Sequence, residues 1–235
     1  MGQHLDETVA RSALYKLLSL SFAQPRDQSA ELFSGIDRIV RALPEIHQAL
    51  LRPVIEERAM AGIGPTEREH TRLFGVGLAV TPYETEYDPL ASARKGHRLA
   101  DLLGFYEAFG FRLAGHQTDF PDHIAIELEF MSLLLLKIAH AEASSVAEAR
   151  AVAEEAAQKF LSDHLAGWGG LFAERAEATT EEEFYRSTAR VLSRFLLAEC
   201  QILGVEPIPS ATLPKDPGPL TCPFASECSE LSGGI

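Results

Sequence analysis

The sequence is poor in cysteine, with three in 235 residues. So small an odd number does not make the disulfide framework of a secreted domain, and a reducing cytoplasm fits it better. The N-terminus lacks the basic region and the small-residue cleavage site of a secretory signal peptide. No apolar run approaches the ~18–20 residues that cross a bilayer. We therefore expect a cytoplasmic protein without stable membrane insertion.

Basic residues are also scarce, because 34 Asp and Glu face only 21 Lys and Arg, for a net charge of −13. This balance argues against non-specific binding to nucleic acid or to an anionic membrane surface. Two interpretations of the acidity stay open. It attracts a basic or mixed partner over long range, or it simply keeps the protein soluble.

The sequence lacks the common catalytic motifs. It contains no phosphate-binding P-loop, no glycine-rich dinucleotide fingerprint after a strand and no serine nucleophile elbow. The segment Glu67-Arg-Glu-His70 supplies one Glu-x-x-His motif, whereas a di-iron bundle needs two of them and two further glutamates. The sequence therefore predicts no catalytic residues, no metal and no cofactor.

Strand patterns with a period of two are absent, and most of the chain has a helical period. The clearest helix is predicted from Asp119, as N-cap, to Ala141, with Pro121 in its first turn. Its apolar stripe repeats at spacings of four, three, four and three residues through Ile124, Leu128, Met131, Leu135 and Ile138. Further apolar residues on its other faces predict a central, buried helix.

The remaining pattern predicts a single-domain, all-α helical bundle over residues 1–204. Further helices are expected from Asp6 to about Pro25, at 29–42, 44–61, 66–75 and 91–110, and after two capping boxes, Ser145 with Glu148 and Thr180 with Glu183. Gly110 and Gly204 are the expected C-terminal caps of two of them. The connection from Gly75 to Pro89 is predicted to be ordered but irregular, and the Pro/Gly/Ser-rich tail, 205–235, to be poorly ordered.

The start of the predicted central helix concentrates polar groups. Asp122 precedes His123 and Glu127, which are four residues apart and share a helix face. One interpretation is structural, with a capping acid and a His–Glu pair that hold the preceding loop. The alternative is a metal-dependent helical-bundle enzyme that uses His70, His123 and Glu127, and adds Cys222 and Cys228 from the tail. Glu129 is expected to meet solvent or an arginine, and Cys200 to lie in the core.

A second group combines apolar and aromatic residues with carboxylates. Leu73, Phe74, Pro82, Tyr83 and Tyr87 come from the end of one helix and from irregular backbone, beside Glu84, Glu86 and Asp88. Such a group is typical of a groove for a peptide with basic residues followed by an apolar stretch. Ordinary burial of a loop is the alternative for any one of these residues.

Four stretches in order resemble the TorD/DmsD/NarJ family of redox-enzyme maturation chaperones. They are Glu69-His-Thr-Arg-Leu-Phe74, Thr81-Pro-Tyr-Glu-Thr-Glu-Tyr87, Leu103-Gly-Phe-Tyr-Glu-Ala-Phe-Gly110, and Pro121-Asp-His-Ile with Glu127-Leu-Glu-Phe-Met131. The likeness covers residues 10–205. The family often has tryptophan where this chain has Tyr83, a difference that bears on which client peptide fits.

The resemblance implies an all-helical, non-catalytic chaperone. Its expected partners are the apo catalytic subunit of a molybdenum-containing oxidoreductase and the twin-arginine signal peptide of that subunit, with no nucleic acid. Its expected binding residues are Leu73, Phe74, Pro82, Tyr83, Glu84, Tyr87, Pro121, Asp122, His123 and Glu127. We expect Asp122 or Glu84 to pair with the guanidinium groups, and a monomer or a domain-swapped dimer.

Overall fold

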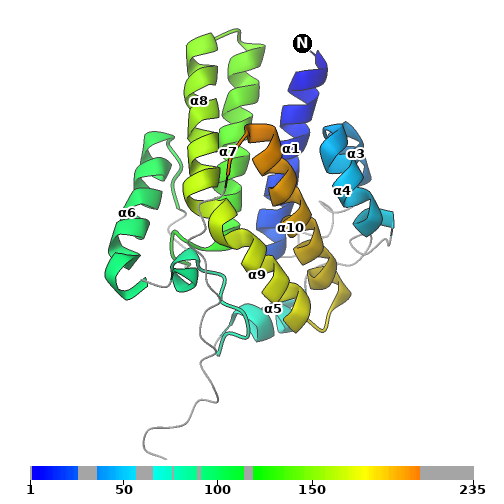
Figure 1. The fold of residues 1–235 in the computed structure, drawn as a ribbon, viewed down its shortest axis with the longest axis vertical. Helices are drawn as coiled ribbons and strands as arrows, with labels where there is room; N and C mark the ends of the chain where they lie inside the picture. The colour runs from blue at the N-terminus through cyan, green and yellow to red at the C-terminus, as the bar shows by residue number, and fades with distance from the viewer. Residues whose placement is uncertain are drawn as a thin grey trace, which may run out of the picture.

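The computed structural model describes residues 2–25, 36–56, 66–75, 77–88, 91–113 and 119–206. Within these ranges the chain is helical, so the predicted all-α class is confirmed (Figure 1). The elements are α1 (Gly2–Phe22), α3 (Ile36–Ala42), α4 (Glu45–Glu56), α5 (Glu67–Phe74), the 3-10 turn η1 (Glu84–Tyr87), α6 (Ala91–Ala108), α7 (Ile124–Ala143), α8 (Ala147–Phe160), the π-helical turn η2 (Leu161–Leu165), α9 (Ala166–Thr179) and α10 (Glu183–Leu203). No helix of this part of the chain is both long and apolar enough to cross a bilayer.

Helix α7 lies at the centre of the fold, as its apolar pattern predicts. It packs against α1 on one side and α8 on another, while α9 and α10 pack against each other (Figure 1). Residues 124–128 are all buried, because α7 is apolar on more than one face. On the α1 side, the Ser12 hydroxyl donates to the Ser132 carbonyl oxygen at 2.9 Å. Glu129 pairs with Lys16 of α1 and its side chain is 39% exposed, so the predicted contact with solvent is confirmed, and its basic partner is a lysine.

The start of α7 differs from the prediction. The N-cap is His123, whose Nδ1 accepts the Ala125 backbone N–H at 3.1 Å, and not Asp119. Residues 121–122 form a turn before the helix, because the Asp122 carbonyl oxygen accepts the Glu84 backbone N–H at 2.9 Å. A contact with a segment almost forty residues earlier in the chain therefore shifts the start of the helix to Ile124.

The two predicted C-terminal caps are confirmed, because Gly110 and Gly204 have the positive φ of a C-terminal cap, 71° and 63°. Helix α5 has Thr66 as its N-cap and ends before Gly75, close to the predicted bounds. The first helix, however, begins at Gly2 rather than after Asp6.

Both predicted capping boxes are wrong. Helix α8 begins at Ala147 with Val146 as its N-cap, and α10 begins at Glu183 with Glu182 as its N-cap, neither with a side-chain cap. The Thr180 hydroxyl donates to Glu69 Oε1 at 2.7 Å and accepts the Glu182 N–H at 3.2 Å, so it does not form the expected box with Glu183.

Two predicted helices, 29–42 and 44–61, correspond to α3 and α4, and their remaining predicted residues lie partly outside the described ranges. The tail from 207 and its two cysteines also lie outside them. Cys200 is buried, as predicted.

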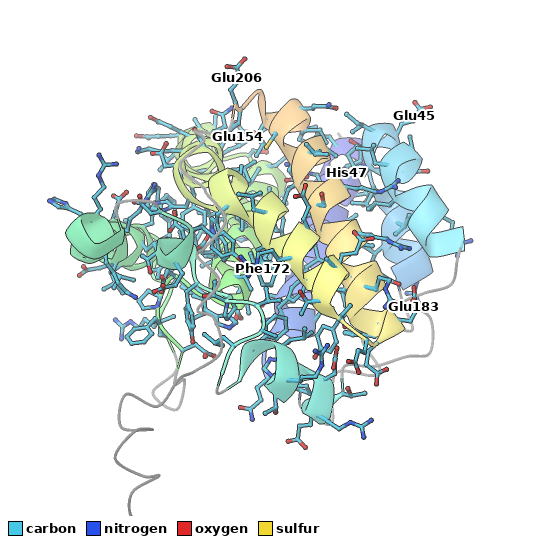
Figure 2. All side chains as sticks on the ribbon, turned by 60° about the horizontal axis from the view of Figure 1, so that its bottom comes forward. Glu45, His47, Glu154, Phe172, Glu183 and Glu206 are labelled. Carbon is cyan, nitrogen blue, oxygen red and sulfur yellow. The ribbon has the colours of Figure 1, made fainter. Side chains whose placement is uncertain are left out.

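Helix α9 continues the chain from α8 through η2, and no motif in the sequence predicted its bounds. It contributes Trp168 and Phe172 to the core, and Figure 2 labels Phe172 along its ribbon. Helices α9 and α10 approach closely at Gly169, where a Cβ atom would lie 2.7 Å from Leu196 Cδ1.

A buried ion pair joins α1 to α10. The Arg11 guanidinium donates two hydrogen bonds to the Glu199 carboxylate, at 2.7 and 2.8 Å. His47 of α4 adds a third contact, with Nε2 at 2.9 Å from Glu199 Oε1, and Figure 2 shows His47 beside α10. Burial by itself would raise the pKa of Glu199, but the charge of Arg11 and the contacts of Arg11 and His47 lower it instead. Glu199 therefore stays ionised inside the protein and joins three helices.

Removing one partner of this pair should be costly, because it leaves a buried charge unpaired. We expect Arg11→Met to lower the free energy of unfolding by about 3 kcal/mol, measured by urea denaturation with Trp168 fluorescence. Lys16→Met, which breaks the half-exposed pair with Glu129, should cost less than about 1 kcal/mol. The double variant Arg11→Met/Glu199→Leu should recover most of the loss. Equal losses in the two single variants would contradict this role for the pair.

Candidate functional site

Three of the four sequence stretches of the family resemblance meet around residues 121–123, and the first stretch is hydrogen-bonded to the connection that precedes the second. Tyr83 and His123 form an antiparallel bridge, in which the Glu84 N–H donates to the Asp122 carbonyl oxygen at 2.9 Å and the Ile124 N–H to the Pro82 carbonyl oxygen at 2.8 Å. The Tyr106 hydroxyl of α6 donates to the Pro121 carbonyl oxygen at 2.8 Å. At the end of α5, the Val80 N–H donates to the Leu73 carbonyl oxygen at 2.9 Å. Segments far apart in sequence therefore form one structural unit.

Asp122 holds the η1 turn. Its Oδ2 accepts the Thr85 hydroxyl at 2.6 Å and the Thr85 backbone N–H at 3.2 Å. The residue is 1% exposed, and its Oδ1 is buried without a hydrogen-bond partner. The carboxylate faces the interior, and a guanidinium group from a peptide would need the turn to open before it could reach Asp122.

Glu84 connects η1 to α6 and η2. Its carboxylate lies 3.3 Å from an Arg98 nitrogen and 3.2 Å from His164 Nδ1. Arg98 also donates to the Asp163 carbonyl oxygen at 2.6 Å. Glu84 is 4% exposed, so its charge is used within the protein.

Glu127 lies in the interior beneath this turn. Trp168 Nε1 donates to Glu127 Oε2 at 3.2 Å, while Oε1 is buried without a hydrogen-bond partner. Burial, reinforced by the nearby charge of Glu84, raises the pKa of Glu127 well above its usual value. Burial therefore favours the protonated form of this carboxyl group in the folded protein. Sequence reasoning missed Trp168, since nothing in the sequence connects it to a residue 41 positions earlier.

His123 is buried and neutral. Burial lowers its pKa to about 4, in keeping with an Nδ1 that accepts a backbone N–H. Burial also lowers the pKa of His70, which contacts the Phe22 carbonyl oxygen. Across the described residues, no group of three or more His, Cys, Asp or Glu side chains is placed to hold a metal ion, including the suggested set of His70, His123 and Glu127.

Most of the predicted apolar binding residues belong to the core. Leu73 is fully buried, Tyr87 is 1% exposed, and Pro82 is also buried. The Phe74 ring packs between Phe22, Phe172 and Tyr185. Tyr87 packs against Trp168 with ring centroids 5.2 Å apart, and its hydroxyl donates to the Thr81 carbonyl oxygen. These side chains position the surface above them.

The exposed part of the unit is centred on Tyr83 and Phe120. The half-buried Tyr83 ring lies edge-on to His123 and to Phe120, with centroids 5.3 and 6.0 Å away. Phe120 is 58% exposed, and Lys95 Nζ lies 6.0 Å from its ring. The Tyr83 hydroxyl lies 3.4 Å from Asp119 Oδ1. We call Tyr83, Asp119 and Phe120 the aromatic patch. Sequence reasoning passed over Phe120, although it lies beside the Pro-Asp-His motif.

Glu69 fixes α5 against the start of α10. Its carboxylate accepts two hydrogen bonds from Arg72, both at 2.7 Å, one from the Thr180 hydroxyl at 2.7 Å and one from the Glu181 N–H at 2.9 Å. The hydrogen bonds from Arg72 are the largest cause that lowers the pKa of Glu69 to about 2. The first stretch of the resemblance thus has a structural role.

Comparison with known proteins places these features in a family. The family model described as nitrate reductase delta subunit matches residues 36–174, which include all four stretches. The chain is 28% identical over 213 residues to a perchlorate reductase assembly chaperone protein of Dechloromonas aromatica, covering 85% of this chain and 92% of that protein. It is 34% identical over 144 residues to a chlorate reductase assembly chaperone protein of Ideonella dechloratans, covering 60% and 72%. It is 26% identical over 228 residues to the chaperone protein TorD of Shewanella loihica, covering 85% and 97%.

The low pKa of Glu69 makes its contribution to stability pH-dependent. A depressed folded-state pKa stabilises the protein fully above the unfolded value, near 4.5, and the stabilisation disappears as the pH falls toward 2. Glu69→Gln should therefore lower the free energy of unfolding by about 3 kcal/mol at pH 7, and by progressively less below pH 4.5. Denaturant titrations between pH 7 and pH 3 would measure this. A deficit that stays constant with pH would contradict the assignment.

Glu127 should behave in the opposite way, because its folded-state pKa is raised. Its neutral form is favoured in the folded protein, so the wild type loses stability as the pH rises above the unfolded value. We expect Glu127→Gln to gain stability relative to wild type by up to about 1.4 kcal/mol per pH unit above pH 4.5, until the folded pKa is reached. Glu129→Gln, on the half-exposed part of the same helix, is the matched control and should show no such rise. A flat difference for Glu127→Gln would mean that the buried group is ionised.

Proposed function

The chain belongs to the nitrate reductase delta subunit family, and we propose on that basis that it is an assembly chaperone for the catalytic subunit of an oxidoreductase. Membership confirms the resemblance carried by the four stretches. The client that the resemblance implies is a molybdenum-containing oxidoreductase, bound in the cytoplasm before its cofactor is inserted. The protein itself carries out no reaction in this proposal.

One observation carries the proposal beyond family membership. Three of the four stretches converge on a single unit, to which the first is joined through Val80, and its buried carboxylates and rings lie beneath an exposed aromatic patch. A chaperone needs such a preformed surface, because a rigid surface loses little conformational entropy on binding. The signature residues are thereby explained without a catalytic role.

We place the twin-arginine signal peptide of the client on the aromatic patch. The rings of Tyr83 and Phe120 offer apolar area to the hydrophobic part of the peptide, and the Asp119 carboxylate attracts its guanidinium groups. Tyr83 and Pro121, the partly exposed members of the expected binding set, contact the peptide. The buried members form the frame: Leu73, Phe74, Pro82, Glu84, Tyr87, Asp122, His123 and Glu127.

Calorimetric titration with a synthetic twin-arginine signal peptide tests this placement. We expect Phe120→Ala to weaken binding about tenfold, because aromatic side chains at the centre of an interface are worth about 1–2 kcal/mol. Leu197→Ala is the matched control, since Leu197 is also 58% exposed but lies on α10. Asp119→Asn should weaken binding and reduce its dependence on salt.

The site fails if the peptide binds wild type and Phe120→Ala equally well. Purification of the protein from its native cytoplasm, followed by identification of the bound proteins, tests the wider proposal. We expect an oxidoreductase catalytic subunit that lacks its cofactor. A preparation that never retains such a subunit would contradict the chaperone function.

A further inference from the structure

An apolar groove lies at the opposite end of α7 from the aromatic patch. It has a volume of about 440 Å³ and is formed by the last turns of α7, the first turns of α8 and the residue that follows α6. Its lining residues are Phe109, Lys137, His140, Ala141, Ser144, Val146, Ala149, Val152 and Ala153. At 1.5 Å per residue, the 14–21 helical positions between His123 and this lining separate the two surfaces by about 20–30 Å.

The shape of the groove suits a helix. Its floor consists of small side chains, with Ala141 5% and Ala153 3% exposed, while Val146 and Val152 stand at 48% and 53% exposure. Small residues on the floor allow another helix to approach closely, and the exposed valines offer it apolar area that water now covers. A groove between two helices is a common site for an amphipathic helix.

The charge of the groove disfavours binding of a basic peptide. Lys137 and His140 are both exposed on the α7 side, and neither has an ion-pair partner among the described residues. The lining includes the ammonium group of Lys137 and no Asp or Glu side chain, in a chain with a net charge of −13. The charge of Lys137 repels an arginine pair and attracts carboxylates that flank an apolar stripe.

We infer that this groove binds an amphipathic helix from the mature part of the client, with acidic residues beside its apolar face. The inference rests on the proposed chaperone function and adds a second binding surface to it. A client that engages both surfaces gains affinity, because binding at one raises the effective concentration at the other. The signal peptide and the mature protein would then be held together.

Two designed peptides of sixteen residues test the inference. Both carry the same leucine face, flanked by glutamates in one and by lysines in the other, and binding is followed by fluorescence anisotropy. We expect the glutamate peptide to bind wild type at least tenfold more tightly than the lysine peptide. Lys137→Glu should reduce or reverse the difference in affinity between the glutamate peptide and the lysine peptide. Equal affinity of wild type for the two peptides would overturn the inference.

Matched variants locate the binding. Val152→Arg and Ala149→Trp, which place a charge or a ring in the groove, should each weaken binding of the glutamate peptide at least tenfold. Leu197→Arg, at a similarly exposed apolar position on α10, should leave it unchanged. Unchanged binding in Val152→Arg would overturn the inference. So would a wild-type dimer, seen by sedimentation, that Val152→Arg dissociates, because the groove would then hold a second copy of this chain.

The twin-arginine peptide, titrated into the same Val152→Arg protein, separates this inference from the proposed function. We expect its affinity to be unchanged, because the aromatic patch lies at the other end of α7. If wild type binds the twin-arginine peptide but does not distinguish the two designed peptides, the groove assignment alone fails. If wild type retains neither the signal peptide nor a catalytic subunit, the chaperone function fails as well.

Discussion

The backbone pairing between residues 82–84 and 122–124 is the constraint on which the functional unit depends. Its two hydrogen bonds, at 2.9 and 2.8 Å, join an irregular loop to the start of the central helix. They set where α7 begins, orient Asp122 toward the η1 turn and place the Tyr83 ring beside Phe120. The N-cap that the sequence predicts at Asp119 does not form, because this pairing places the start of the helix after His123. The surface that we assign to the client is a consequence of it.

The buried carboxyl groups of this acidic protein differ in their hydrogen-bond partners and in the direction of their pKa shifts. Glu69 and Glu199 stay ionised, because each accepts several hydrogen bonds that include two from an arginine. Glu127 receives a single hydrogen bond, from Trp168, and burial raises its pKa. The first arrangement joins helices that are distant in sequence, and the second fills the interior beneath the loop. Neither presents charge to a partner, so the net charge of −13 is a poor guide to the binding surface.

This distribution changes how the family signature is understood. A motif rich in Asp, His and Glu suggests a site that contacts its partner through those groups. Here Asp122 and His123 bind backbone N–H groups, and Glu127 binds the Trp168 indole. In our proposal the half-buried Tyr83 and the exposed Phe120 beside them contact the client. Such a division suits a chaperone, because the buried groups fix the backbone and leave the exposed side chains available to the client. The separate apolar groove on α7 and α8 is the surface to which we assign a second segment of the client.

The sequence by itself determined the all-α class, the central helix and the family. Each depends on local periodicity or on ordered motifs, and a helix that is apolar on several faces has to lie inside. The tertiary structure alone decided that His123 and not Asp119 caps α7, that Thr180 serves Glu69 and not a capping box, and that Trp168 meets Glu127. It also decided which predicted binding residues are buried. A capping hydrogen bond contributes only about 1 kcal/mol, so a long-range contact displaces it, and burial depends on neighbours that lie tens of residues away in the chain.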